Sequence, residues 1–215
     1  MIRLDIFSDP VCPWCMIGKA HLDRALAQHP EHPFQIQWHP FQLNPDMPKG
    51  GMPRPKYLSD KFGGPEAAAK FYARIQEAAE AAGISIDFGA IPVMPNSLDA
   101  HRLIHWAGLE GRQNAVMDAL FNAYWLNARD IGAADVLVEI AASCGMDAAV
   151  TARLLASDAD ADDLSARDLD ARTKGVTGVP TFLIAQQYVV SGAQPPEVWG
   201  NIIAELLEKI PAVEE

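Results

Sequence analysis

The sequence predicts an α/β protein in which a β-α-β unit and a β-β-α unit enclose a long helical segment. Three observations support this prediction. Apolar and polar residues alternate in Met1–Phe7 and in Phe34–His39, which is the period of half-buried strands. The middle of the chain carries apolar residues at helical spacing. After Gly175, β-branched and aromatic residues typical of strands return.

The first unit joins these two strands through a helix. Asp5 alternates with Leu4 and Ile6 in the first strand, so we expect its carboxylate to face solvent rather than to accept a proton from a cysteine. The helix is expected to run from Pro13 to Gln28, because proline is favoured at the first helical position, where its missing N–H is not needed. Cys12 is then the N-cap residue.

The helical segment follows a proline-rich and glycine-rich stretch, Asn44–Pro55, which we expect to be a linker or a lid. Apolar periodicity predicts helices over residues 65–82, 96–108, 115–124, 136–141 and 150–155. Asn96 is the expected N-cap of the second of these helices, with Asp99 in its first turn. The acidic run Asp158–Asp170 is expected to be a solvated helix face rather than a docking surface for basic partners.

The last unit is a hairpin and a helix. Thr181–Ile184 and Tyr188–Val190 are the expected strands, and an amphipathic helix is expected to start near Pro195-Pro196. These elements divide the chain into residues 1–60 and 175–215, which form one domain together, and residues 61–174, which form an all-helical insertion domain.

Composition narrows the classes of function. Hydrophobic residues make up 49% of the 215 residues, which is enough for a globular core. The net charge of −11 argues against nucleic acid and anionic membranes as partners, because both would repel the chain. No segment combines the basic and apolar regions of a signal peptide, and no apolar run is long enough to span a bilayer, so a cytoplasmic location is expected.

The motif Cys12-Pro13-Trp14-Cys15 carries the predicted chemistry. A cysteine at a helix N-terminus lies beside unpaired backbone N–H groups and the positive end of the helix dipole, and both stabilise the thiolate that attacks disulfides. We therefore expect Cys12 to be the attacking sulfur at the open end of the helix. Cys15, on the inward stripe, is expected to resolve the mixed disulfide. Trp14 is expected to shield the pair on one side.

Half of a zinc site is the other interpretation of two cysteines at this spacing, but zinc needs four ligands. Cys144 is the only other thiol, and only His101 and His105 have a helical ligand spacing. We therefore expect no metal, and a redox function is favoured, as is common for this motif in a cytosolic chain.

Three other residues have alternative interpretations. Cys144 is expected to be buried and inert. Asp9 would raise the energy of the Cys12 thiolate if its carboxylate pointed inward, but an Asp-Pro dipeptide is more typical of a solvated turn, and the sequence leaves its role open. His101 lies near the start of a helix, where it either contacts a substrate or is a partly buried structural histidine, and the sequence leaves both roles open.

Four separated segments together resemble one known family. They are Ser8–Gly18 around the two cysteines, Pro95–Arg102, Gly175–Thr181 and Ser191–Gln194. In this order they resemble the DsbA family of thiol-disulfide oxidoreductases, and within it the FrnE-like branch. The resemblance implies a thioredoxin-like fold with a large all-helical insertion domain. It also implies a cis peptide bond before Pro180, which would leave the Val179 backbone free to bond an extended substrate. Homodimers are expected by resemblance only.

The expected function is thiol-disulfide exchange at Cys12 and Cys15 with protein or small-thiol substrates, without an organic cofactor. Glutathione remains open as a co-substrate. Related 2-hydroxychromene-2-carboxylate isomerases and kappa-class glutathione transferases generally carry serine where this chain has Cys12, so a glutathione-dependent isomerase or transferase is the alternative. A non-catalytic binding protein is the third hypothesis. The expected substrate-binding residues are Pro13, Trp14, Val179, Pro180, Asn96 and His101.

Overall fold

The computed structural model describes residues 1–209, which form a central sheet, two helices on one of its faces and a long helical insert. The sheet contains β1 (Ile2–Ser8), β2 (Phe34–Pro40), β5 (Thr181–Ile184) and β6 (Tyr188–Ser191), in the order β2-β1-β5-β6. β1 is parallel to β2 and antiparallel to β5, which is antiparallel to β6. These elements confirm the predicted fold class.

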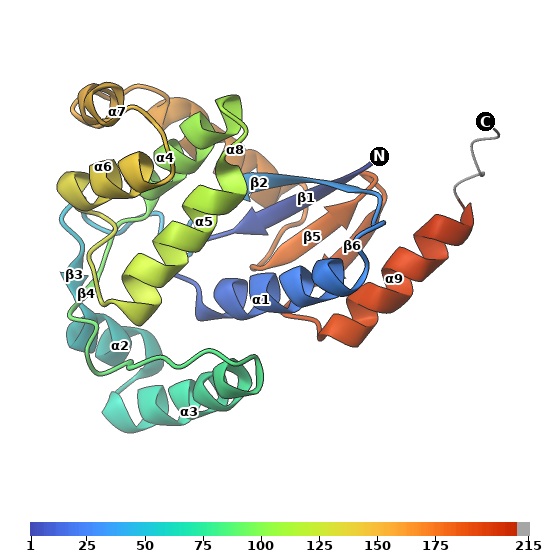
Figure 1. The fold of residues 1–215 in the computed structure, drawn as a ribbon. Coiled ribbons are helices and arrows are strands. Elements are labelled where there is room, and N and C mark those ends of the chain that lie inside the picture. The colour runs from blue at the N-terminus through green and yellow to red at the C-terminus, as the bar shows by residue number, and fades with distance from the viewer. Residues whose placement is uncertain (210–215) are drawn as a thin grey trace.

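Helices α1 (Pro13–Gln28) and α9 (Pro196–Lys209) lie together along one face of the sheet (Figure 1). Leu4 and Ile6 of β1 are fully buried on this face, and Phe182 of β5 makes an edge-to-face contact with Trp199 of α9. Complete burial of one such aliphatic side chain contributes about 1.5–3 kcal/mol. This apolar layer fixes α1, and therefore its N-terminus, against the sheet.

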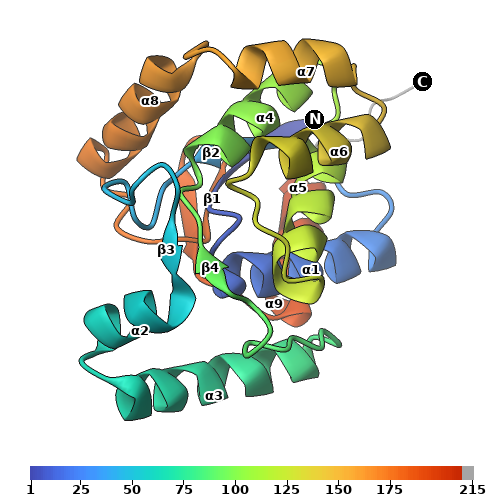
Figure 2. The ribbon, with the colours of Figure 1, turned by 90° about the vertical axis from the view of Figure 1, so that its left-hand side faces the viewer.

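The insert lies between β2 and β5, and most of it is helical, as predicted. Figure 2 shows α2 and α3 in a layer of their own, on the opposite side of β3 and β4 from α4, α6 and α7. In chain order its elements are β3 (Met52–Pro53), α2 (Arg54–Phe62), α3 (Pro65–Ala81), β4 (Val93–Met94), α4 (Leu98–Leu109), α5 (Gln113–Phe121), the π-helix η1 (Asn122–Leu126), α6 (Ala134–Ser143), α7 (Ala148–Leu155) and α8 (Ala161–Thr173). No helix within residues 1–209 is both long and apolar enough to cross a membrane.

The predicted linker contains structure that the sequence did not indicate. β3 pairs with β4, and α2 begins at Arg54, so the predicted domain boundary at residue 60 falls inside a helix. Pro55 is compatible with this helix because it lies in the first turn, where its N–H is not needed. Residues 210–215 of the last predicted segment lie outside the described residues.

The prediction that Asp5 is exposed is wrong, because Asp5 is only 2% exposed. Its side chain lies on the sheet face opposite α1, where Arg3 donates to Oδ1 at 2.6 Å and Nε2 of His39 lies 2.5 Å from the same oxygen. Helices α4 and α8 pack against β2 at this face. Alternation indicates exposure only where the second face of a sheet meets solvent, and here it is partly covered.

His39 should make stability depend on pH. Burial lowers the pKa of His39 from its ordinary value of 6.5, and the effect of Asp5, which raises it, is smaller. The unfolded chain therefore binds a proton first as the pH falls through about 6.5, so stability present above that pH is lost below it. Between about pH 7.5 and about pH 5.5, the melting temperature of the wild type should fall more than that of His39→Gln. Equal slopes in the two proteins would contradict this prediction.

Candidate functional site

Cys12 lies at the end of a tight turn that leads from β1 into α1. Its backbone dihedrals are extended, with φ −97° and ψ 115°, and it is the N-cap of α1 with Pro13 in the first turn, as predicted. The N–H of Cys12 donates to the carbonyl of Asp9 at 2.9 Å, and the carbonyl of Cys12 accepts the N–H of Cys15 at 3.1 Å. The Cys12-Pro13 pair therefore places the start of α1 at the cysteine motif.

Asp9 anchors this turn from inside the protein. Its carboxylate is fully buried, with Oδ1 accepting the N–H of Val11 at 3.3 Å and Oδ2 accepting the N–H of Leu43 at 2.7 Å. Trp125 adds a third anchor, because its Nε1–H donates to the carbonyl of Pro10 at 3.0 Å. The prediction of a solvated turn is therefore wrong, since Leu43 and Trp125 come from distant segments and enclose Asp9.

The two thiols are free and lie in unequal surroundings. Cys15 is 1% exposed, and burial raises its pKa well above the ordinary value; the adjacent Cys12 raises it further, and the hydroxyl of Ser8 and the backbone of Asp9 partly offset the rise. Cys15 is therefore a thiol at neutral pH. Cys12 is 3% exposed, so its sulfur is more covered than its predicted place at an open helix end suggested.

A loop from the far end of the chain covers Cys12. The peptide bond between Val179 and Pro180 is cis, and the Sγ–H of Cys12 donates to the Val179 carbonyl at 3.6 Å. Gly18 of α1 faces this loop, where a Cβ atom would stand only 3.0 Å from Cγ of Pro180. The absence of a side chain at Gly18 therefore lets the helix and the loop approach closely.

The other predicted site residues lie in the motif itself and near the start of α4. Pro13 is buried and Trp14 is half-buried within the motif itself. Asn96 is half-buried and lies one residue before the observed N-cap, Ser97; its Oδ1 accepts the N–H of Leu98 at 2.8 Å, and its Nδ2 donates to Met47. Asn96 thus fixes the start of α4, as an N-cap would, and its amide is engaged with the protein.

His101 of α4 lies beside the buried carboxylate of Asp9. Its side chain is 3% exposed, and Nε2 lies 3.6 Å from Oδ1 of Asp9 without a hydrogen bond. In this structure His101 contributes to the closed surroundings of Asp9, and its contact with a substrate stays a prediction.

Three residues near the motif were missed by the sequence analysis. Ser8 is buried with no hydrogen bond to its hydroxyl, although this hydroxyl acts on the Cys15 thiol. Arg54 is 3% exposed, donates to the Phe88 carbonyl at 2.6 Å and lies 4.7 Å over the ring of Tyr72. Burial raises the pKa of Tyr72, Arg54 partly offsets this rise, and Tyr57 and Cys12 add smaller increases.

For residues outside the motif, the burial predicted from the sequence agrees only in part with the structure. Cys144 is half-buried rather than buried. The acidic run is mostly exposed along α8, as predicted, but Asp168 is buried, where it accepts from the N–H of Gln42 and pairs with Arg172. Among the described residues, no three His, Cys, Asp or Glu side chains gather closely enough to hold a metal ion.

Comparison with protein families gives a match over nearly the whole chain. Residues 3–204 match the family described as DSBA-like thioredoxin domain. The uncharacterized protein YwbO of Bacillus subtilis strain 168 is 26% identical over 209 residues, which cover 97% of this chain and 98% of that protein.

Two solved structures show the same fold. A probable DsbA oxidoreductase from Streptomyces coelicolor is 31% identical and superposes with a TM-score of 0.85 over 100% of this chain and 94% of that chain. A 2-hydroxychromene-2-carboxylate isomerase is 18% identical, with a TM-score of 0.74 over 99% of this chain and 100% of that chain. The second similarity concerns the fold alone.

The close approach of Gly18 to Pro180 should tolerate no side chain. Gly18→Val should lower the free energy of unfolding by about 1–3 kcal/mol, because the added atoms meet the ring of Pro180 and the backbone of Ala193. Gly50→Val is the matched control, since a Cβ at Gly50 meets nothing within 4 Å. Denaturant unfolding measures both variants. Equal stabilities would show that the helix and the loop do not pack as described.

Proposed function

Because the chain belongs to the DSBA-like thioredoxin domain family, we propose that it is a thiol-disulfide oxidoreductase that uses Cys12 and Cys15. One observation carries the proposal. Two free cysteines lie one helical turn apart at the N-terminus of α1, and Cys12 contacts the Val179 carbonyl of the cis-proline loop. Exchange between dithiols and disulfides needs an attacking sulfur and a resolving sulfur in this arrangement.

The reaction runs through a mixed disulfide. The thiolate of Cys12 attacks one sulfur of a substrate disulfide, so a bond from Cys12 to that sulfur forms and the substrate S–S bond breaks. The released substrate thiolate takes up a proton. The thiolate of Cys15 then attacks Cys12, which forms the Cys12–Cys15 disulfide and releases the second substrate thiol. Two electrons pass to the substrate, and the reverse sequence oxidises a substrate dithiol.

The positions of the two cysteines in the turn and the helix support these roles. Cys12 ends the turn at the N-terminus of α1, which gives it the position of the attacking sulfur in this proposal. Cys15 lies inside, and because burial raises its pKa it stays protonated until the mixed disulfide forms beside it. The Ser8 hydroxyl and the backbone of Asp9 offset part of this rise.

Access to Cys12 requires a local movement. Its side chain is 3% exposed and its thiol is engaged with the Val179 carbonyl. A substrate must therefore replace this contact, and the Val179 backbone then becomes available to the substrate chain. The loop that covers Cys12 is in this proposal also the surface that binds an extended peptide.

A glutathione-dependent isomerase is the second candidate, because the chain shares its fold with a 2-hydroxychromene-2-carboxylate isomerase. That chemistry needs a glutathione thiolate but no second protein sulfur. Activity towards a small aromatic substrate that needs glutathione and survives Cys15→Ser would favour this candidate. A non-catalytic binding protein, the third hypothesis, predicts thiols that react with neither disulfides nor glutathione.

Substitution of the cysteines separates the candidates. Cys12→Ser should abolish the reduction of insulin disulfides, because no attacking sulfur remains. Cys15→Ala should accumulate mixed disulfides on Cys12, including one with oxidised glutathione, because no sulfur resolves them. Mass spectrometry of the intact protein detects these adducts. Cys144→Ser, which removes the half-buried thiol, is the control and should retain wild-type activity.

A redox titration in glutathione buffers gives a second readout. The wild type should change by two hydrogen masses as the Cys12–Cys15 disulfide forms, and both single variants should lack this change. If Cys12 in the native protein stays unmodified by iodoacetamide and by oxidised glutathione at every pH at which the protein is folded, its sulfur is inaccessible and the proposal fails.

A further inference from the structure

The face of the sheet opposite α1 carries an uncovered hollow. By register, Asp5, Leu183 and Val189 form one row across β1, β5 and β6, and Phe7, Thr181 and Ser191 form the next. Helices α4 and α8 pack against β2 at this face. Val189 in the outer strand β6 is 63% exposed, so the cover does not extend over the whole sheet.

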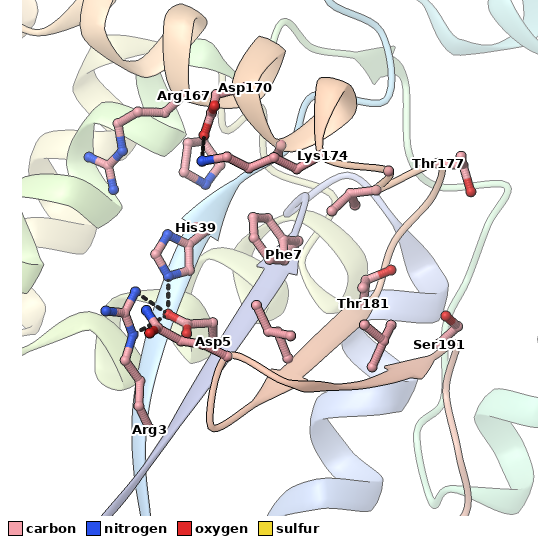
Figure 3. A pocket seen from close by; sticks show the side chains of 17 residues that line it. Arg3, Asp5, Phe7, His39, Arg167, Asp170, Lys174, Thr177, Thr181 and Ser191 are labelled. Carbon is pink, nitrogen blue, oxygen red and sulfur yellow. Dashed lines mark hydrogen bonds and ion pairs between the residues drawn. The ribbon is translucent and has the colours of Figure 1, made fainter.

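A pocket of about 410 Å³ lies over these two rows of side chains. The C-terminal end of α8 and residues 174–177 form its other wall. Figure 3 shows Arg167 and Asp170 of α8, with Lys174 directly after the helix, on one side of the pocket and Arg3 and Asp5 of β1 on the other, with His39 and Phe7 between them. Pockets that bind small molecules commonly measure about 300–1,000 Å³. Neither cysteine of the motif lines this pocket.

One part of the pocket is apolar. Phe7, Leu183 and Val189 line it, and Phe7 stacks on His39 with 5.1 Å between ring centroids. Most of Val189 is exposed in the pocket wall. A ligand with an aromatic or branched body would remove this apolar surface from water, which favours binding at about 25 cal/mol per Å².

The charged part of the pocket is positive in a strongly negative protein. Arg3, Arg167 and Lys174 carry three positive charges and Asp5 and Asp170 two negative ones, so the charged lining sums to 3 − 2 = +1, against −11 for the whole chain. Arg3 is held by Asp5, and Lys174 is held by Asp170 in an exposed pair. The lining therefore attracts one negative charge.

Arg167 has the most hydrogen-bonding capacity left for such a charge. Its Nη1 lies 3.1 Å from Nδ1 of His105 and 3.6 Å from Oδ2 of Asp163, and Asp163 is 59% exposed. No other polar contact of its guanidinium is found among the described residues. A planar guanidinium matches the two oxygens of a carboxylate, and exposed pairs such as Arg167–Asp163 contribute little that a ligand would have to replace.

The acidic groups limit the ligand to a single negative charge. Asp5 lies at the floor of the pocket with Oδ2 unpartnered and buried. Burial lowers the pKa of His39, so its ring is neutral at neutral pH and adds no positive charge. A second negative charge, as on a phosphate or a dicarboxylate, would lie near Asp5 or Asp170, and this proximity disfavours such ligands.

We propose that this pocket is a binding site for a monocarboxylate with an aromatic or branched aliphatic body. Arg167 donates to the carboxylate, assisted by Lys174, and Phe7, Leu183 and Val189 contact the body of the ligand. The proposal does not depend on the redox function, because it uses none of the residues of the cysteine motif.

Benzoate, titrated into the ¹⁵N-labelled full chain, tests the proposal. The amide resonances of Phe7, Leu183 and Val189 should shift, and those of the cysteine motif should shift less. Arg167→Gln should raise the dissociation constant of benzoate about 3–10-fold, because it removes one charge-assisted contact at a partly exposed site. Neutral benzamide, cationic benzylamine and the dianion phthalate should each bind more weakly than benzoate.

Two lysines provide a matched control. Lys174 and Lys209 are both exposed and each pairs with an acidic residue four positions earlier, but only Lys174 lines the pocket. Lys174→Gln should weaken benzoate binding and Lys209→Gln should leave it unchanged. The proposal is overturned if benzoate shifts no resonance near the pocket, if the two lysine variants behave alike, or if benzylamine, benzamide or phthalate binds as tightly as benzoate.

Discussion

The geometry of the cysteine motif depends on the buried carboxylate of Asp9. This carboxylate accepts backbone N–H groups of Val11 and Leu43, and the Asp9 carbonyl accepts the N–H of Cys12. A buried carboxyl group is costly unless donors satisfy its oxygens, so these bonds stabilise the turn. Trp125 of the insert bonds the same turn at Pro10. The site is therefore held jointly by the sheet and by the insert.

The features predicted correctly from the sequence are those that depend on residues close together in the chain. The strand period gave β1 and β2, and the Cys-Pro pair gave the start of α1 at Cys12, because each depends on neighbours in the chain. The burial of Asp5 and Asp9 was missed because their partners, His39 and Leu43, lie more than thirty residues away. Helix α2 was missed for a similar reason: it has only two buried residues, Tyr57 and the cation Arg54, and Arg54 is enclosed by aromatic rings from distant segments.

Burial also shapes the chemistry of Cys15. Both cysteines lie in the same helical turn, so the helix dipole alone distinguishes them only modestly. Cys15 is enclosed by the apolar layer between α1 and the sheet, and desolvation is the largest cause of the rise in its pKa. Ser8 partly compensates for this rise, and it precedes Asp9 in the same buried turn. Residues of this turn thus also act on the Cys15 thiol.

The loop before β5 connects the two faces of the sheet. Val179 turns its carbonyl to Cys12, and Thr181, two residues later, lines the pocket on the opposite face. The hydroxyl of Thr181 bonds the carbonyl of Gly178 at 2.7 Å, so the backbone on both sides of Pro180 is tied into one short unit. Residues 178–181 therefore form one short segment that places the Val179 carbonyl against Cys12 and Thr181 in the wall of the pocket.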